Sequence, residues 1–150
     1  GGFEIAMLSD FIIAGQKASF GLPEGKHSLI PGAGGTQNLP RLIGAPLAKE
    51  LIWTGRRIAA SDAKEFRIVN HVVEPGKALS KTREIIEEMR RVGPLATMMS
   101  KQAINRGRDM TLQQGFQQES DLAYMLSWAD DRAEGLKAFS ERRKPDFKGQ

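Results

Sequence analysis

The chain has 150 residues, 40% of them apolar, and a formal net charge of +4 at pH 7. This length suits one domain or a piece of a larger one, and the apolar content is enough to build a core. Cysteine is absent, which excludes disulfides and cysteine-ligated metals, and the two histidines, His27 and His71, give a zinc site little support. No apolar run approaches the length of a membrane span.

The first stretch, "GGFEIAML", sets Glu4 between Phe3 and Ile5. The pattern indicates a first helical turn that buries a carboxylate among apolar side chains, where a charge is normally costly. Glu4 is therefore either a functional group or a partly solvated residue stabilised by the helix dipole. Because the chain opens on two glycines instead of methionine, we expect it to be the later part of a longer polypeptide.

Residues 11–45 combine short β-prone pieces with glycine and proline. Residues 11–14 and 18–21 are predicted strands. The run "PGAGGT" resembles a phosphate-binding loop but lacks the following lysine and Ser or Thr, so it predicts a tight turn that opens a helix.

Helices dominate after residue 45. Residues 46–54 have apolar side chains at helical spacing, and Gly55 is the expected stop. Ser61 and Asp62 are candidate caps for a short helix, and residues 67–73 alternate as in a strand.

Helical spacing returns from residue 79, and Pro94 opens a further helix in which Met98 and Met99 are expected to fill a core or an interface. Thr111 followed by Gln114 forms a predicted capping box, and Asp131 followed by Glu134 resembles one.

Two carboxylates in the glycine-rich part are the best candidates for chemistry, namely Glu4 and Glu24. A pair of carboxylates in an apolar cleft can add or remove water, since one activates the water and the other gives a proton to carbon. Negative charge on a conjugated carbonyl would need N–H donors, which Gly1 and Gly2 could supply ahead of the first helix. Glu24 could equally be a loop charge or a helix cap, and only the fold can bring it to Glu4.

Four stretches carry a family resemblance: "GGFEIAMLSDFIIAGQKASFGLPE", "IPGAGGTQNLPRLIG", "AKELIWTGRRIAASDAKEFRIVNHVV" and "DDRAEGLKAFSERRKPDFKGQ". Together they resemble the C-terminal half of the crotonase superfamily, specifically the enoyl-CoA hydratases. The resemblance implies an α/β crotonase-like fold, a spiral of ββα units. Residues 1–75 would be the C-terminal part of that core, with both glutamates, and residues 76–150 a helical oligomerisation region.

The resemblance also implies an activity, the syn addition of water to a 2-trans-enoyl-CoA to give a 3-hydroxyacyl-CoA, in fatty acid or amino acid degradation. Glu4 would activate the water and Glu24 would protonate the α-carbon, while Gly1, followed by Gly2, would supply an oxyanion N–H. No separate cofactor is implied, because coenzyme A is part of the substrate. Two residues would contact the coenzyme A moiety: Phe139 and Arg142.

The expected partners are an acyl-CoA thioester and further copies of the chain, in a homotrimer or a dimer of trimers. A membrane partner is not expected, and the basic tail lacks the interleaved aromatics of a nucleic-acid site. Either the bacterial cytoplasm or the mitochondrial matrix is compatible with the family.

Three alternatives stay open: an enoyl-CoA isomerase, a methylglutaconyl-type hydratase, and a catalytically silent helical oligomerisation piece. Isomerases of the superfamily typically keep one of the two carboxylates, so the presence of both favours hydration. The sequence departs from the family at Asn38, where arginine is usual, and at the polar run from Gly25 to Ser28, where apolar residues are usual.

Overall fold

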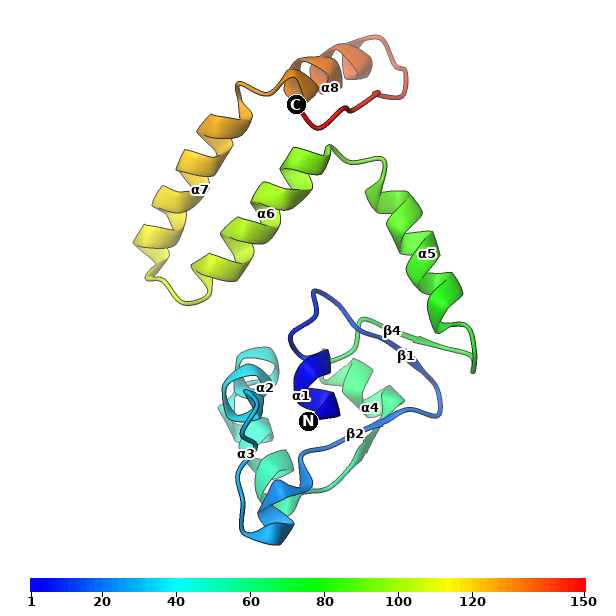
Figure 1. The fold of residues 1–150 in the computed structure, drawn as a ribbon, viewed down its shortest axis with the longest axis vertical. Coiled ribbons are helices and arrows are strands. Elements are labelled where there is room, and N and C mark those ends of the chain that lie inside the picture. The colour runs from blue at the N-terminus through cyan, green and yellow to red at the C-terminus, as the bar shows by residue number, and fades with distance from the viewer. The chain divides into compact units, whose positions relative to one another are not determined.

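The computed structural model describes residues 1–150, which divide into two compact units, Gly1–Glu84 and Ile85–Gln150 (Figure 1). The division falls inside helix α5 (Ala78–Met89), whereas the sequence prediction sets it after residue 75. The first turns of α5 stay with the first unit because Ser80, Lys81 and Glu84 border the same surface hollow as Val73.

The first unit alternates short helices with short strands. Its helices are α1 (Gly2–Ala6), the 3₁₀-helix η1 (Pro23–His27), α2 (Gly35–Ile43), α3 (Ala45–Thr54) and α4 (Ala60–Glu65). Its strands are β1 (Ile13–Gly15), β2 (Ser19–Phe20), β3 (Ile58–Ala59) and β4 (His71–Val73). The predicted strands exist at β1, β2 and β4 but are shorter than the sequence suggests, because only a few residues of each find a pairing partner.

Two separate two-stranded sheets join residues that are far apart in the sequence. Strands β1 and β4 are parallel, with Ala14 opposite Val72, and β2 and β3 are antiparallel, with Phe20 opposite Ile58. His71 begins β4 and is half-buried, and His27 is exposed at the end of η1, so neither histidine lies in the core.

The core of the first unit is small and aliphatic. Helices α2 and α3 form a hairpin around Gly44 and contribute Leu39, Ala48 and Leu51. The remaining buried apolar residues come from the other elements: Met7, Ala14, Leu22, Ile58, Ala60, Ala63, Ile68 and Val69. Burial of this kind stabilises the unit by about 25 cal/mol per Å² of apolar surface.

The second unit is helical. It contains the end of α5, then α6 (Pro94–Gly107), α7 (Leu112–Leu126) and α8 (Asp130–Ser140). Helices α6 and α7 pack against each other as an antiparallel pair, with Leu122 among the few buried residues (Figure 1). Many large apolar side chains of this unit are exposed, among them Met98, Ile104, Leu112, Phe116, Tyr124, Trp128 and Phe139. Met98 is 55% exposed, so it is not a core residue of this unit.

Some of the helix ends predicted from the sequence are confirmed, and others are wrong. Gly55 ends α3 in the left-handed conformation with φ of 57°, Pro94 opens α6, and the Thr111–Gln114 capping box is formed, all as predicted. The caps predicted at Ser61 and Asp62 are wrong, because α4 begins at Ala60 directly from β3.

The second predicted capping box, Asp131 with Glu134, is also wrong. Helix α8 has Ala129 as its N-cap residue, and both carboxylates lie inside the helix. They bind backbone N–H groups of the segment that follows α8.

None of the helices combines the length and the hydropathy that a membrane span requires.

Candidate active site

Glu4 is a buried carboxylate with fixed partners. Its residue is 2% exposed, and its Oε1 accepts hydrogen bonds from the backbone N–H groups of Ala33 and Gly35, each at 2.9 Å. The Gly1 nitrogen lies 3.4 Å from the other oxygen, Oε2. The partly solvated first-turn interpretation is therefore wrong, because the carboxylate is enclosed and held in one orientation.

The surroundings of Glu4 keep it ionised. Burial acts to raise the pKa of this carboxyl, but the hydrogen bonds from Gly35, Ala33 and the chain's amino group outweigh it and bring the pKa below its ordinary value of 4.5. A carboxylate that is charged at neutral pH has the state that a general base needs.

The turn before α2 supplies the donors for Glu4. The segment "PGAGG" curves so that the N–H groups of Ala33 and Gly35 point to one oxygen, and Gly34 has φ of 99° to make the turn. Sequence reasoning identified this run as a turn that opens a helix, which is confirmed, but missed that it holds Glu4. The glycine repeat was the only available signal, since glycine permits close approach of backbone to another group.

Gly35 is the point where three segments meet. The position that a Cβ atom would occupy on Gly35 lies 2.7 Å from Pro31 Cβ, 2.9 Å from Glu4 Oε1 and 3.0 Å from Leu22 Cδ1. Leu22 is the N-cap residue of η1, two positions before Glu24. The fold therefore brings the segment that carries Glu24 next to the Glu4 carboxylate, which the sequence could not establish.

Glu24 has a different environment from Glu4. It is the second residue of η1, and one of its carboxyl oxygens, Oε2, is buried without a hydrogen-bond partner. A buried polar atom without a partner is rare in a folded protein, and this feature distinguishes Glu24 from Glu4. A Cβ atom on Gly25 would lie 3.3 Å from the Ile52 carbonyl oxygen, and one on Gly55 would lie 3.0 Å from the Lys26 side chain. Helix η1 is therefore packed tightly against the end of α3.

Gly1 and Gly2, the oxyanion donors predicted from the sequence, lie at the start of α1. Gly1 is the N-cap residue of α1 and Gly2 its first residue, and both are exposed with no heavy atom within 4 Å of a Cβ position. Open space at the first turn of a helix, where backbone N–H groups lack partners within the helix, fits a site for a carbonyl oxygen.

Phe139 and Arg142 belong to the second unit. Phe139 lies near the end of α8 and is 85% exposed, and Arg142 follows the helix with φ of 54°. An apolar cleft of about 620 Å³ lies elsewhere in the same unit and is lined by residues such as Leu126, Leu136 and Phe147.

The sequence and the structure were compared with known proteins. The sequence profile of the enoyl-CoA hydratase/isomerase family matches residues 1–150. The chain belongs to this family. Its fold is accordingly the α/β crotonase fold expected from the sequence.

Solved structures of the family agree closely with this chain. An enoyl-CoA hydratase from Bacillus anthracis is 46% identical, with a TM-score of 0.96 over 99% of this chain and 58% of that one. An enoyl-CoA hydratase from Mycobacterium tuberculosis is 35% identical, with a TM-score of 0.95 over 100% of this chain and 60% of that one.

Curated relatives are bacterial and mitochondrial. The 2,3-dehydroadipyl-CoA hydratase of Escherichia coli is 40% identical over 99% of this chain and 58% of its own length. The mitochondrial enoyl-CoA hydratase of Pongo abelii is 40% identical over 100% of this chain and 52% of its own length. The chain thus spans somewhat more than half the length of these relatives.

Proposed function

We propose that residues 1–150 form the C-terminal part of an enoyl-CoA hydratase, which adds water to the double bond of a 2-trans-enoyl-CoA. The observation that carries the proposal is the contrast between the environments of two glutamates. Glu4 is buried, ionised and fully hydrogen-bonded through one oxygen, while Glu24 keeps a buried oxygen without a partner. Two carboxylates in unequal environments suit a reaction that needs a base and an acid.

In the proposed mechanism, the Glu4 carboxylate orients a water molecule and accepts its proton as the oxygen bonds to the β-carbon. The electrons of the double bond move toward the thioester carbonyl, and the N–H groups at the start of α1 stabilise the negative charge on its oxygen. Glu24 gives its proton to the α-carbon, which leaves Glu24 as a carboxylate and Glu4 protonated. The product is a 3-hydroxyacyl-CoA, and after its release Glu4 loses its proton and Glu24 gains one through solvent, so that the net reaction consumes only the substrate and water.

The hydrogen bonds from Ala33 and Gly35 would have a mechanistic role as well. They occupy Oε1 of Glu4, so the water would bind at Oε2, which also lies 3.4 Å from the Gly1 nitrogen. They also prevent rotation of the carboxylate, which keeps the base oriented before the substrate arrives. The same donors lower the basicity of Glu4, which keeps it ionised between turnovers.

The proposal predicts large and separate effects for the two glutamates. In the full-length protein, Glu4→Gln and Glu24→Gln should each lower kcat for crotonyl-CoA by about 10²- to 10⁴-fold, since each amide removes one proton-transfer group. The measurement is the loss of the conjugated-thioester absorbance, with circular dichroism to confirm folding. Glu65→Gln is the matched control, because Glu65 is an exposed carboxylate on α4.

The outcomes test the two-carboxylate mechanism and two of the open alternatives, the isomerase and the silent oligomerisation piece. Full hydration by the Glu24→Gln protein would refute the two-carboxylate mechanism. Double-bond migration in a 3-enoyl-CoA without hydration of a 2-enoyl-CoA would identify an isomerase. Neither reaction in the wild-type protein would leave the silent oligomerisation piece.

A further inference from the structure

The segment after α8 folds back along that helix and is hydrogen-bonded to it. Both oxygens of Asp131 accept backbone hydrogen bonds, from Lys148 at 2.6 Å and from Gly149 at 2.8 Å. The Asp131 N–H in turn donates to the Gln150 carbonyl at 3.0 Å. Residues 143–150, which we call the tail, thus end beside the first turn of α8 (Figure 1).

A second set of hydrogen bonds joins the tail to α8 one turn further along the helix. Glu134 accepts from both terminal nitrogens of Arg143, at 2.6 and 2.8 Å, and from the Asp146 N–H at 2.8 Å. Arg143 also donates to Glu141 at 2.6 Å. Two parallel N–H···O bonds between a guanidinium and a carboxylate fix direction as well as distance.

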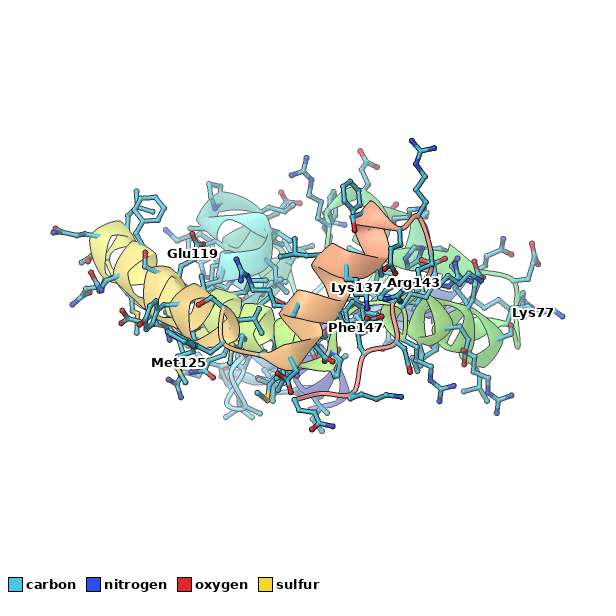
Figure 2. All side chains as sticks on the ribbon, turned by 90° about the horizontal axis from the view of Figure 1, so that it is seen from above. Lys77, Glu119, Met125, Lys137, Arg143 and Phe147 are labelled. Carbon is cyan, nitrogen blue, oxygen red and sulfur yellow. The ribbon has the colours of Figure 1, made fainter.

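An aromatic contact completes the attachment. The Phe147 ring comes within 3.4 Å of the position that a Cβ would occupy on Gly135 in α8, and within 3.9 Å of that on Gly93 before α6. Figure 2 shows Arg143 and Phe147 close to α8, with Lys137 nearby. The tail is therefore packed against the helices of the second unit and belongs to it.

Arg142 lies at the point where the chain reverses. Its N–H donates to the Phe139 carbonyl and the Arg143 N–H donates to the Ala138 carbonyl, the pair of bonds that ends a helix in a Schellman motif. Arg142 itself adopts a left-handed conformation, with φ of 54°. Glycine is usual at this position, because a Cβ atom makes the conformation unfavourable.

The side chain of Arg142 is exposed and has no hydrogen-bond or ion-pair partner, in contrast to that of Arg143. A strained backbone persists when its surroundings hold it, and such residues gather at functional sites. Here the surroundings are the Glu134–Arg143 pair on one side and α8 on the other. The backbone from which the Arg142 side chain extends is then held by that pair.

We propose that Glu134 and Arg143 are positioning residues that hold Arg142 in its left-handed conformation and so present its guanidinium to a phosphate of the coenzyme A moiety. This inference rests on the proposed function, because it takes an acyl-CoA as the ligand. Phosphate is the chemistry that fits, since an arginine without an internal partner binds phosphate oxygens through paired N–H groups.

The test compares ligands with and without the 3′-phospho-ADP part, in the full-length protein. In Glu134→Gln, the Kd for coenzyme A and the KM for crotonyl-CoA should rise about tenfold, the equivalent of one charge-assisted hydrogen bond. The kcat, and the KM for crotonyl-pantetheine, should stay within about twofold. Glu119→Gln is the matched control, because Glu119 is an exposed carboxylate on α7 (Figure 2).

A double variant separates positioning from general destabilisation. Arg142→Gly should raise the Kd for coenzyme A at least as much as Glu134→Gln while relieving the backbone strain. Adding Glu134→Gln to Arg142→Gly should have no further effect on coenzyme A. Arg143→Lys, which keeps the charge without the paired geometry, serves if Glu134→Gln lowers the melting temperature strongly, and its effect should be intermediate.

Specific results would overturn the proposal. One is an equal rise in KM for crotonyl-pantetheine, and another is an effect of Glu134→Gln that persists in the Arg142→Gly background. Unchanged coenzyme A affinity in Arg142→Gly would also overturn it, while hydration that depends on Glu4 and Glu24 would then leave the proposed function intact. Conversely, the expected coenzyme A affinities without hydration by the wild-type protein would support the positioning role and refute the hydratase.

Discussion

Glu4 and Gly35 form a pair in which each residue requires the other. The carboxylate needs the Gly35 N–H to be stable inside the protein, and the short contact leaves no room for a side chain on Gly35. The sequence indicated that Glu4 was unusual, because a charge among apolar residues is costly. It could not indicate the donors, since Ala33 and Gly35 are about thirty residues away in the chain.

Gly35→Ala should therefore disturb both stability and chemistry. The added methyl group would lie within 3.0 Å of Pro31, Glu4 and Leu22, so we expect a loss of about 1–3 kcal/mol in the free energy of unfolding. The displaced carboxylate should also lower the hydratase activity of the full-length protein. Denaturant unfolding and crotonyl-CoA hydration measure the two effects.

A second glycine provides the control for this prediction. Gly115 lies inside α7, and nothing is within 4 Å of its Cβ position. Gly115→Ala should stabilise the helix by up to about 1 kcal/mol, because alanine has the higher helix propensity. Equal stability changes in the two variants would contradict the packing account.

At the scale of the elements, predictions from the local sequence are confirmed where the two interacting residues lie within one helical turn of each other. The Thr111 hydroxyl accepts from the Gln114 N–H, and the Gln114 side chain accepts from the Thr111 N–H, as the spacing predicts. Thr111→Ala should cost about 1 kcal/mol of unfolding free energy. Thr82→Ala on α5 is the control, because its hydroxyl binds a carbonyl inside a helix and caps nothing. A loss of the same size at both positions would show that the cap contributes nothing specific.

The same spacing wrongly predicted a capping box at Asp131 and Glu134. Both residues have the side chains that a capping box requires, but the helix begins at Asp130 and the tail takes both carboxylates. A capping pattern is a local property, whereas the tail is a competing partner from later in the chain. Nothing in the spacing distinguishes the two uses.

The attachment of the tail should depend on pH through Glu134. Its hydrogen bonds from Arg143 and from the Asp146 N–H lower the pKa of Glu134 from 4.5 to about 2. A lowered pKa in the folded state means that this contribution is complete above about pH 4.5 and is lost as the pH falls toward 2. The Asp146 amide shift in an NMR titration should follow that loss, with a midpoint near 2. A midpoint near 4.5 would show that the pair does not form in solution.

At the scale of the whole molecule, the helical unit is short of buried apolar surface. Leu112, Phe116 and Tyr124 recur at helical spacing along α7, Trp128 follows the end of that helix, and all four are more than half exposed. Exposed apolar surface on this scale usually marks an interface. We propose that copies of the protein associate through this face, in agreement with the trimer that the resemblance implies.

Trp128→Glu should weaken that association. A carboxylate at a desolvated contact is unfavourable, so sedimentation velocity should show a shift toward the monomer mass. Gln113→Glu is the control for the added charge, because Gln113 is an exposed polar residue of α7. An unchanged mass distribution in Trp128→Glu would exclude this face as the interface.

The sequence by itself determined the family, the helical second half, the helix ends at Gly55, Pro94 and Thr111, and the identity of Glu4 and Glu24 as candidate residues. These follow from local pattern and from residue types that are costly in their setting. Tertiary structure alone decided which groups meet: Ala33 and Gly35 on Glu4, Leu22 against Gly35, and the tail on Asp131 and Glu134. The physical reason is that hydrogen bonds and close packing act over about 3 Å in space, whatever the separation along the chain.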